Sequence, residues 1–196
     1  MYTNLFCKTV ILAIAVAATP VLAQTDQTGL GGPVIPGVCL MSREAVLVNS
    51  AAGKAATARL QQLTTEAQTE IDTERAPLTA EVEALRKASS TLTPEQRKTR
   101  EQAVSIKLQA LQAKAEHRGR EIEATRTKAL DQISVQAQAV IASVYKQKSC
   151  GLLMDRNSVL GGNLTNDITA TVVQGLDAKL GTITFNRETL PMPTAK

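Results

Sequence analysis

The sequence predicts an α+β protein, predominantly α, in which a long antiparallel helical hairpin projects from a small β-rich body. Residues 50–148 carry apolar side chains at helical spacing, and a turn signal near their middle divides them into two arms. The flanking residues, 37–49 and 149–185, contain short β-prone runs that would form the body. Aromatic residues make up only 2% of the chain, whereas a compact core would draw on several of them. The hairpin is therefore expected to extend away from the body.

Both arms of the hairpin show the periodicity of a helix that buries one narrow stripe. The apolar positions are Leu60, Leu63, Ala67, Ile71, Leu78, Val82 and Leu85 in the first arm, and Val104, Leu108, Leu111, Ala115, Ile122, Leu130, Ile133, Ala137, Val140 and Val144 in the second. Between the arms, Thr93 is placed to cap the second helix, Pro94 suits its first turn, and Gln96 completes a capping box. Pro77 should bend the first helix near residues 72–75.

Residues 1–23 are expected to be a signal peptide. Lys8 is basic, an apolar run follows over residues 9–18, and Val21-Leu22-Ala23 is a cleavage motif that places the cut after Ala23. The alternative is an uncleaved membrane anchor, although the apolar run has about half the length of a spanning helix. We therefore expect the chain to be exported. Residues 24–36, rich in Gly, Pro, Thr and Gln, are expected to form a disordered lead-in.

The body is expected to contain three short strands. Residues 37–41 predict a buried strand, residues 150–155 predict a second, and Ser158-Val159-Leu160 predict a third. Helical turns are expected over residues 42–47, and Asn49-Ser50 offers a cap to the first arm. Gly53, inside the arm helix, indicates close packing at the base of the hairpin.

A last helix and a tail complete the prediction. Asp167 is a natural cap for a helix, Gly181 would end it, and its apolar face consists of Ile168, Val172, Leu176 and Leu180. Residues 182–185 are β-prone. Residues 186–196, which contain two prolines, are expected to form a loose tail.

Removal of the signal peptide leaves two cysteines, Cys39 and Cys150, just outside the two ends of the hairpin. In an oxidising compartment such a pair is commonly joined. The bridge would close a long loop, which in the chain-entropy model adds about 4–5 kcal/mol of stability. Two buried free thiols, or bridges between subunits, are the alternatives, and the sequence does not decide among the three.

Side chains that could support catalysis or metal binding are not grouped in the sequence. The single histidine, His117, is expected to be a solvated helix residue without a placed nucleophile. The two cysteines have no further His or Cys at ligand spacing, and the carboxylates of the arms are expected to face water. The sequence therefore predicts a protein that is not an enzyme and uses no cofactor or metal. A net charge of only +4, without a nucleic-acid motif, argues against a nucleic-acid partner.

The charge of the hairpin changes sign along its length. Residues 59–83 are acidic on balance, whereas the residues on both sides of the turn are basic. This basic tip consists of Arg86, Lys87, Arg97, Lys98 and Arg100. It is either an ordinary solvated turn or a surface that attracts an anionic membrane or client.

In this order of elements the chain resembles the Skp/OmpH family of periplasmic chaperones. The resemblance covers roughly residues 34–180 and begins after the exported N-terminus. Its segments are Val38–Met41, Asn49-Ser50-Ala51-Ala52-Gly53-Lys54-Ala55, Leu92-Thr93-Pro94-Glu95-Gln96-Arg97, Leu152-Leu153-Met154-Asp155-Arg156-Asn157-Ser158-Val159-Leu160 and Asn166-Asp167-Ile168-Thr169. The cysteine pair and the tail beyond Leu180 depart from the family's pattern.

The resemblance implies a homotrimer whose bodies assemble around a three-fold axis while three arms enclose an unfolded outer-membrane protein. It also implies a periplasmic, ATP-independent holdase. Contact with anionic lipid or lipopolysaccharide stays open, because the lipopolysaccharide site of family members cannot be matched residue by residue to this sequence. The small size of the predicted body fits a core shared by three copies, because such a body would not be stable alone. Arms rich in Ala, Gln, Thr and alternating charge would hold many clients without selecting among them.

The alternative function is a structural or adaptor hairpin of the cell envelope. Such a hairpin should keep its apolar stripe dry and present a specific tip. It would usually belong to a longer chain with lipoyl-like or barrel domains.

Overall fold

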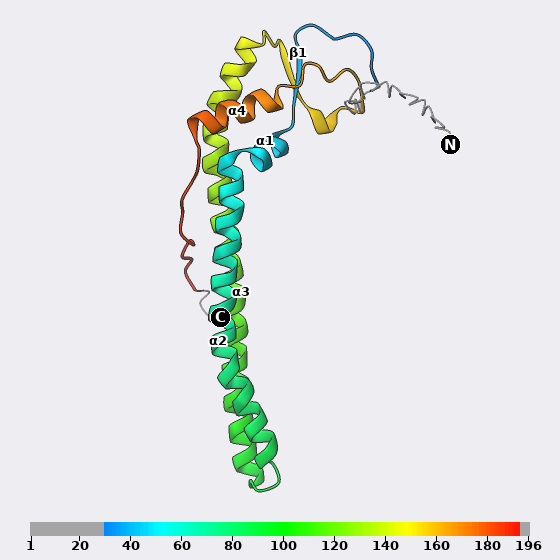
Figure 1. Ribbon diagram of the computed structural model, residues 1–196. Helices are drawn as coiled ribbons and strands as arrows, with labels where there is room; N and C mark the ends of the chain where they lie inside the picture. The colour runs from blue at the N-terminus through cyan, green and yellow to red at the C-terminus, as the bar shows by residue number, and fades with distance from the viewer. Residues whose placement is uncertain (1–29, 193–196) are drawn as a thin grey trace, which may run out of the picture.

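The structure is a computed structural model that describes residues 30–192. The predicted signal peptide, the first part of the lead-in and the last four residues of the tail lie outside the described residues. The order of elements is β1, α1, α2, α3, β2, a 3-10 turn and α4. Figure 1 shows one long helical hairpin with the short elements gathered at one end. The predicted fold class, α+β with a predominance of helix, is confirmed.

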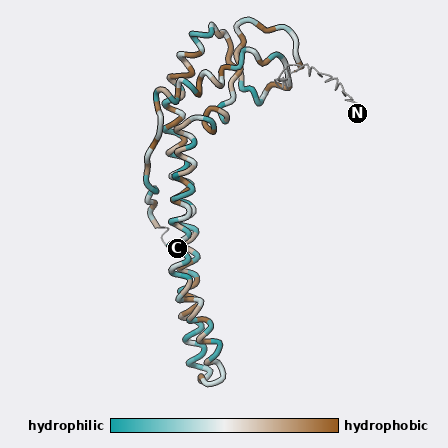
Figure 2. Tube along the Cα trace, in the orientation of Figure 1, coloured by the Kyte–Doolittle hydropathy of each residue, from teal (hydrophilic) through white to brown (hydrophobic). Residues whose placement is uncertain are grey.

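The hairpin consists of α2 (Ala51–Ala88) and α3 (Pro94–Gln147). The predicted capping box is present, since Gln96 N donates to Thr93 Oγ1 at 3.3 Å and Thr93 N donates to Gln96 Oε1 at 3.1 Å. Pro77 lies within α2, which is helical on both sides of it; the bend expected there stays a prediction. Figure 2 shows hydrophilic and hydrophobic residues interleaved along both helices.

Gly53 lies at the base of the hairpin, where the chain enters α2 from the short helix α1 (Arg43–Asn49). A Cβ atom on Gly53 would overlap the carbonyl oxygen of Leu47. Ser50 caps α2, and its Oγ accepts from Gly53 N at 3.1 Å. The close packing predicted from this glycine is therefore confirmed, and it sets the sharp angle between α1 and α2.

The first two predicted strands are present as β1 (Val38–Met41) and β2 (Leu152–Asp155), and they pair in parallel. The predicted third strand at residues 158–160 is wrong. Residues 156–158 form a 3-10 turn instead, because the Asp155 carboxylate accepts from Asn157 N at 2.8 Å and turns the chain. On its other side β1 pairs with a single residue, Asp167. The second edge of β2 has no partner among residues 30–192.

Helix α4 (Thr169–Lys179) packs across the base of the hairpin. Asp167 Oδ1 accepts from Thr169 N at 2.8 Å, so this side chain serves the first turn as predicted, although the helix boundary itself falls at Ile168. Val172 and Leu176 are fully buried against α3. The shared core joins β1, α1, α4, the first turns of α2 and the last turns of α3, so the body and the arm's base form one packed unit.

The β-prone residues 182–185 form no strand, and residues 186–192 are bound to the arm and do not form the expected loose tail. Residues 181–192, here called the strap, run in an extended path beside the hairpin from its base toward its middle (Figure 1). Within the lead-in, residues 30–36 form no helix or strand, yet Asn163 Nδ2 donates to Gly32 O at 2.9 Å. None of the helices described over residues 30–192 combines the length and apolarity needed to cross a bilayer.

Candidate functional site

The two arm helices are joined along one side by ion pairs in antiparallel register. Acidic residues of α2 meet basic residues of α3 in the pairs Glu81–Lys107, Glu74–Lys114 and Glu70–Arg118. From Lys107 to Lys114 to Arg118, α3 advances by seven and then four residues. Their partners on α2 go back by the same seven and four residues, as an antiparallel pair of helices requires. The acidic character of residues 59–83, noted in the sequence, is therefore complementary to α3. Because these groups are partly exposed, they set register more than they add stability.

Three polar side chains occupy the apolar seam of α3. From Ile133, the buried face continues backward in steps of four through Ala129, Thr125, Glu121 and His117. His117 is 3% exposed and Glu121 is 1% exposed. The expectation that His117 is a solvated residue is wrong, and so is the expectation that the arm's carboxylates all face water. Leu108 and Leu130, which were expected in the seam, are instead exposed.

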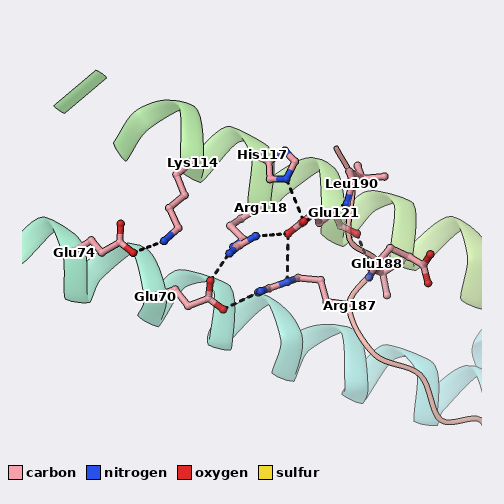
Figure 3. A network of polar contacts seen from close by, with 10 residues as sticks. Glu70, Glu74, Lys114, His117, Arg118, Glu121, Arg187, Glu188 and Leu190 are labelled. Atoms are coloured by element: carbon pink, nitrogen blue, oxygen red, sulfur yellow. Dashed lines mark hydrogen bonds and ion pairs between the residues drawn. The ribbon is translucent and has the colours of Figure 1, made fainter. Parts of the chain in front are cut away.

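Glu121, the buried carboxylate, forms a closed ring of four charged residues with Glu70, Arg118 and Arg187 (Figure 3). Arg118 donates to Glu70 at 2.8 Å and to Glu121 at 2.7 Å. Arg187, from the strap, donates to Glu70 at 2.9 Å and lies 3.4 Å from Glu121. Charges alternate around the ring, so each carboxylate faces two guanidinium groups. This arrangement compensates the burial of Glu121, which would otherwise be costly.

The strap also binds the arm through its main chain. Glu188 N donates to Thr125 Oγ1 at 2.9 Å, and Leu190 N donates to Glu121 Oε1 at 3.3 Å. Nearer the body, Arg59 Nε donates to Phe185 O at 3.1 Å. Alternate residues of an extended segment thus point their amides toward one helix face, as in a strand that pairs with a neighbour.

The ring fixes the charge state of Glu70, Arg118 and Glu121. Burial alone would raise the pKa of the Glu121 carboxyl, but hydrogen bonds from Arg118 and Leu190 N outweigh it and hold the pKa below its usual value. Arg187 and Arg118 together lower the pKa of Glu70 in the same way, again against the effect of burial. The hydrogen bond to Glu121 raises the pKa of Arg118. All three groups are therefore ionised near neutral pH.

A groove of about 740 Å³ opens beside the ring. Its apolar wall includes Leu78 of α2, Leu111 of α3, and Leu190 and Met192 of the strap. His117 also lines it, and its Nδ1 atom is buried without a hydrogen-bond partner among the described residues. His117 Nε2 lies 3.2 Å from Glu121 Oε1. No group of three or more His, Cys, Asp or Glu side chains in the described part of the chain has metal-binding geometry.

The residues proposed from the sequence lie at the two ends of the hairpin. Arg86, Lys87, Arg97, Lys98 and Arg100 are all exposed around the turn between α2 and α3. At the other end, Cys39 and Cys150 face each other with their Cα atoms 5.7 Å apart, the spacing that a disulfide requires. The fold therefore brings the five basic residues together at the tip and the two cysteines together at the base, as expected for a hairpin.

Sequence reasoning missed the mid-arm site, which consists of Glu70, His117, Arg118, Glu121 and Thr125. A signal for it existed in α3, since the stripe through Ile133 and Ala137 extends backward in steps of four onto polar residues. The partner residue, Arg187, could not be found this way, because it lies in a segment without helical or strand periodicity.

The fold and the site together define a hairpin-arm protein, in which a small body presents a long helical arm with an internal polar cluster. The profile of a family described as Outer membrane protein (OmpH-like) matches residues 37–176, and the chain belongs to that family. This membership confirms the resemblance seen in the sequence. The strap lies beyond the matched residues.

A solved structure from Caulobacter crescentus CB15, described as a candidate outer membrane chaperone (OmpH-like), is similar to this chain. The two are 36% identical, with a TM-score of 0.74. The match covers 81% of this chain and 94% of the other. A comparison with curated proteins found no match.

Proposed function

We propose that this protein is an ATP-independent holdase chaperone that binds unfolded outer-membrane proteins in the periplasm and prevents their aggregation. The observation that carries the proposal is the projecting hairpin, held on a small body, in a chain of the OmpH-like family. The similar Caulobacter structure is described as a candidate outer membrane chaperone, which supports the same role.

The arm surface suits a protein that holds many clients. Its exposed apolar side chains are scattered singly among charged and small residues, so they offer weak, adaptable contacts without a large sticky patch. They are Val82, Ile106, Leu108, Leu130 and Val135. Such a surface can bind unfolded chains without choosing one sequence.

Assembly into a homotrimer is part of the proposal. The free edge of β2 carries Leu152, which is 52% exposed, and Met154, which is partly exposed. An uncovered strand edge with apolar side chains favours association, and a two-stranded sheet is too small to be stable alone. Three bodies that cover one another's edges would leave three arms around a shared space.

The adaptor function receives less support. An adaptor hairpin was expected to keep its seam dry, and the buried seam of α3 does not distinguish the two functions. The family match and the similar Caulobacter structure favour the chaperone. The basic tip suits either function, since it could approach anionic lipid, lipopolysaccharide or an acidic client segment.

The test is light scattering of a urea-diluted outer-membrane porin with and without the mature protein, in the absence of ATP. We expect scattering to fall as the protein approaches one trimer per porin. Lysozyme at the same mass concentration controls for simple crowding. Unchanged scattering at several-fold excess of trimer would contradict the holdase function and favour an adaptor.

A further inference from the structure

The strap is bound to the mid-arm site as a peptide ligand would be. Three kinds of contact hold it: main-chain amides on Thr125 and Glu121, a guanidinium between two carboxylates, and apolar side chains at the groove. Lys128 adds an ion pair to Glu188 at 2.8 Å. Of these contacts, only those made by the side chains of Arg187 and Glu188 depend on the charge of a strap residue. The amide contacts would be available to any extended segment.

The arm alone is not electrically balanced at this place. Without Arg187, the carboxylates of Glu70 and Glu121 share the one guanidinium of Arg118, with the imidazole of His117 beside Glu121. Any segment that replaced the strap would therefore need to bring a cation. His117 Nδ1, buried and without a partner among the described residues, lies in the wall of the same groove and offers a further polar contact.

We propose that the mid-arm site is a docking site for extended, basic segments of unfolded polypeptide, and that the strap is its resident occupant. The site accepts a segment with an Arg or Lys at the position of Arg187. Main-chain amides one and three residues later donate to the arm, and apolar side chains near the end of the segment line the groove. A client segment enters by displacing the strap. The identity of that client rests on the proposed function; the docking site itself does not.

The strap's short tether explains why it occupies the site in the free protein. It begins directly after α4, which packs at the base of the hairpin, so its local concentration is on the order of millimolar. A free peptide of the same sequence competes poorly with it. Loss of Arg187 removes its strongest contact and opens the site, while Arg118 continues to pair with Glu121.

The test uses the full chain and a fluorescent peptide with the sequence of residues 182–192, followed by fluorescence anisotropy. We expect the peptide to bind Arg187→Ala at least about tenfold more tightly than the parent, since an intramolecular competitor is removed. Arg126→Ala, an exposed change on the same helix, should bind like the parent. N-methylation of the peptide at the positions of Glu188 and Leu190 should weaken binding to Arg187→Ala at least tenfold. Equal binding by parent and Arg187→Ala, or no effect of N-methylation, would overturn the proposal.

A second measurement distinguishes a failure of the proposed docking site from a failure of the proposed holdase function. Urea-diluted porin is added to Arg187→Ala that carries the peptide, and release of the peptide is followed beside light scattering. Release of the peptide supports the proposal. Suppressed scattering without release overturns it and leaves the holdase function standing. Release without suppressed scattering supports the docking site and overturns the holdase function.

Discussion

Arg118 and Arg187 contact the same two carboxylates, Glu70 and Glu121, although one guanidinium comes from α3 and the other from the strap. Glu121 lies in the seam between the arm helices, where an unpaired charge would be costly. The strap therefore does more than lie on the surface, because it completes the neutralisation of a buried group. The stability of the arm and the position of the strap are linked through this one carboxylate.

The first prediction concerns Arg118. Arg118→Ala removes the shortest contact to the Glu121 carboxylate and should lower the free energy of unfolding by about 1.5–3 kcal/mol. Arg126→Ala, whose ion pair is exposed, should stay within about 0.5 kcal/mol of the parent. Urea unfolding followed by circular dichroism, at one fixed protomer concentration, measures both. Equal stability of the two variants would show that the ring is not a stabilising unit.

The second prediction concerns pH. The pKa values of Glu70 and Glu121 are lowered in the folded state from an ordinary value of 4.5. Groups of this kind stabilise the folded contact fully above that ordinary value and lose their contribution as pH falls through the lowered one. Strap binding should thus be constant from pH 7 to about 5 and weaken below about 4.5. Amide resonances of Glu188 and Leu190 in NMR spectra should report it, and strap release already at pH 6 would contradict this reading.

Cys39 and Cys150 provide the third prediction. Non-reducing mass spectrometry of exported protein should find them joined within one chain. Changing both to Ser should lower stability by up to about 4–5 kcal/mol, because the bridge closes the loop that contains the whole hairpin. Holdase activity should persist, since the bridge holds the body and not the arm. Free thiols, or dimers joined through either cysteine, would refute the bridge.

The fourth prediction concerns assembly. The mature protein should be a trimer at micromolar concentration, and Leu152→Lys with Met154→Lys should dissociate it by placing charges on the free edge of β2. Val48→Lys, on an exposed position of α1, is the matched control and should leave the trimer intact. Sedimentation equilibrium distinguishes the states. A folded, monodisperse monomer of the parent would contradict the shared core.

Local signals in the sequence were enough for the hairpin and its base. The Thr93 capping box, the seam through Leu63 and Ile71, and the close approach at Gly53 depend on residues that are near one another in the chain. Each of these patterns is typical of one local structure, so that local structure could be predicted from the sequence.

The mid-arm site could not be predicted, because its energetics depend on residues far apart in the chain. Glu121 in the seam is paired by Arg118 on its own helix and also by Arg187, which reaches it from the strap, 66 positions later in the numbering. Residues 182–185 are β-prone in sequence but form no strand, and the carbonyl of Phe185 accepts a hydrogen bond from Arg59 of α2 instead of from another strand.

The last prediction concerns the basic tip. Its five cations are exposed around the hairpin turn, and among the described residues none of them takes part in an ion pair, unlike Lys107 and Lys114 further along the arm. Exposed charges of this kind typically change folding stability by no more than about 0.5 kcal/mol each, so their reversal should leave the assembly intact. They should instead speed encounters with anionic lipid or acidic clients, and that effect weakens as salt rises.

Arg97→Glu, Lys98→Glu and Arg100→Glu together should slow porin capture or weaken binding to phosphatidylglycerol vesicles in 20 mM salt, with the difference from the parent shrinking in 500 mM salt. Arg126→Glu, an exposed change distant from the tip and outside the strap contacts, separates a local effect from one of net charge. If both measurements are unchanged in low salt, the tip is a solvated turn, and clients are held by the arms alone.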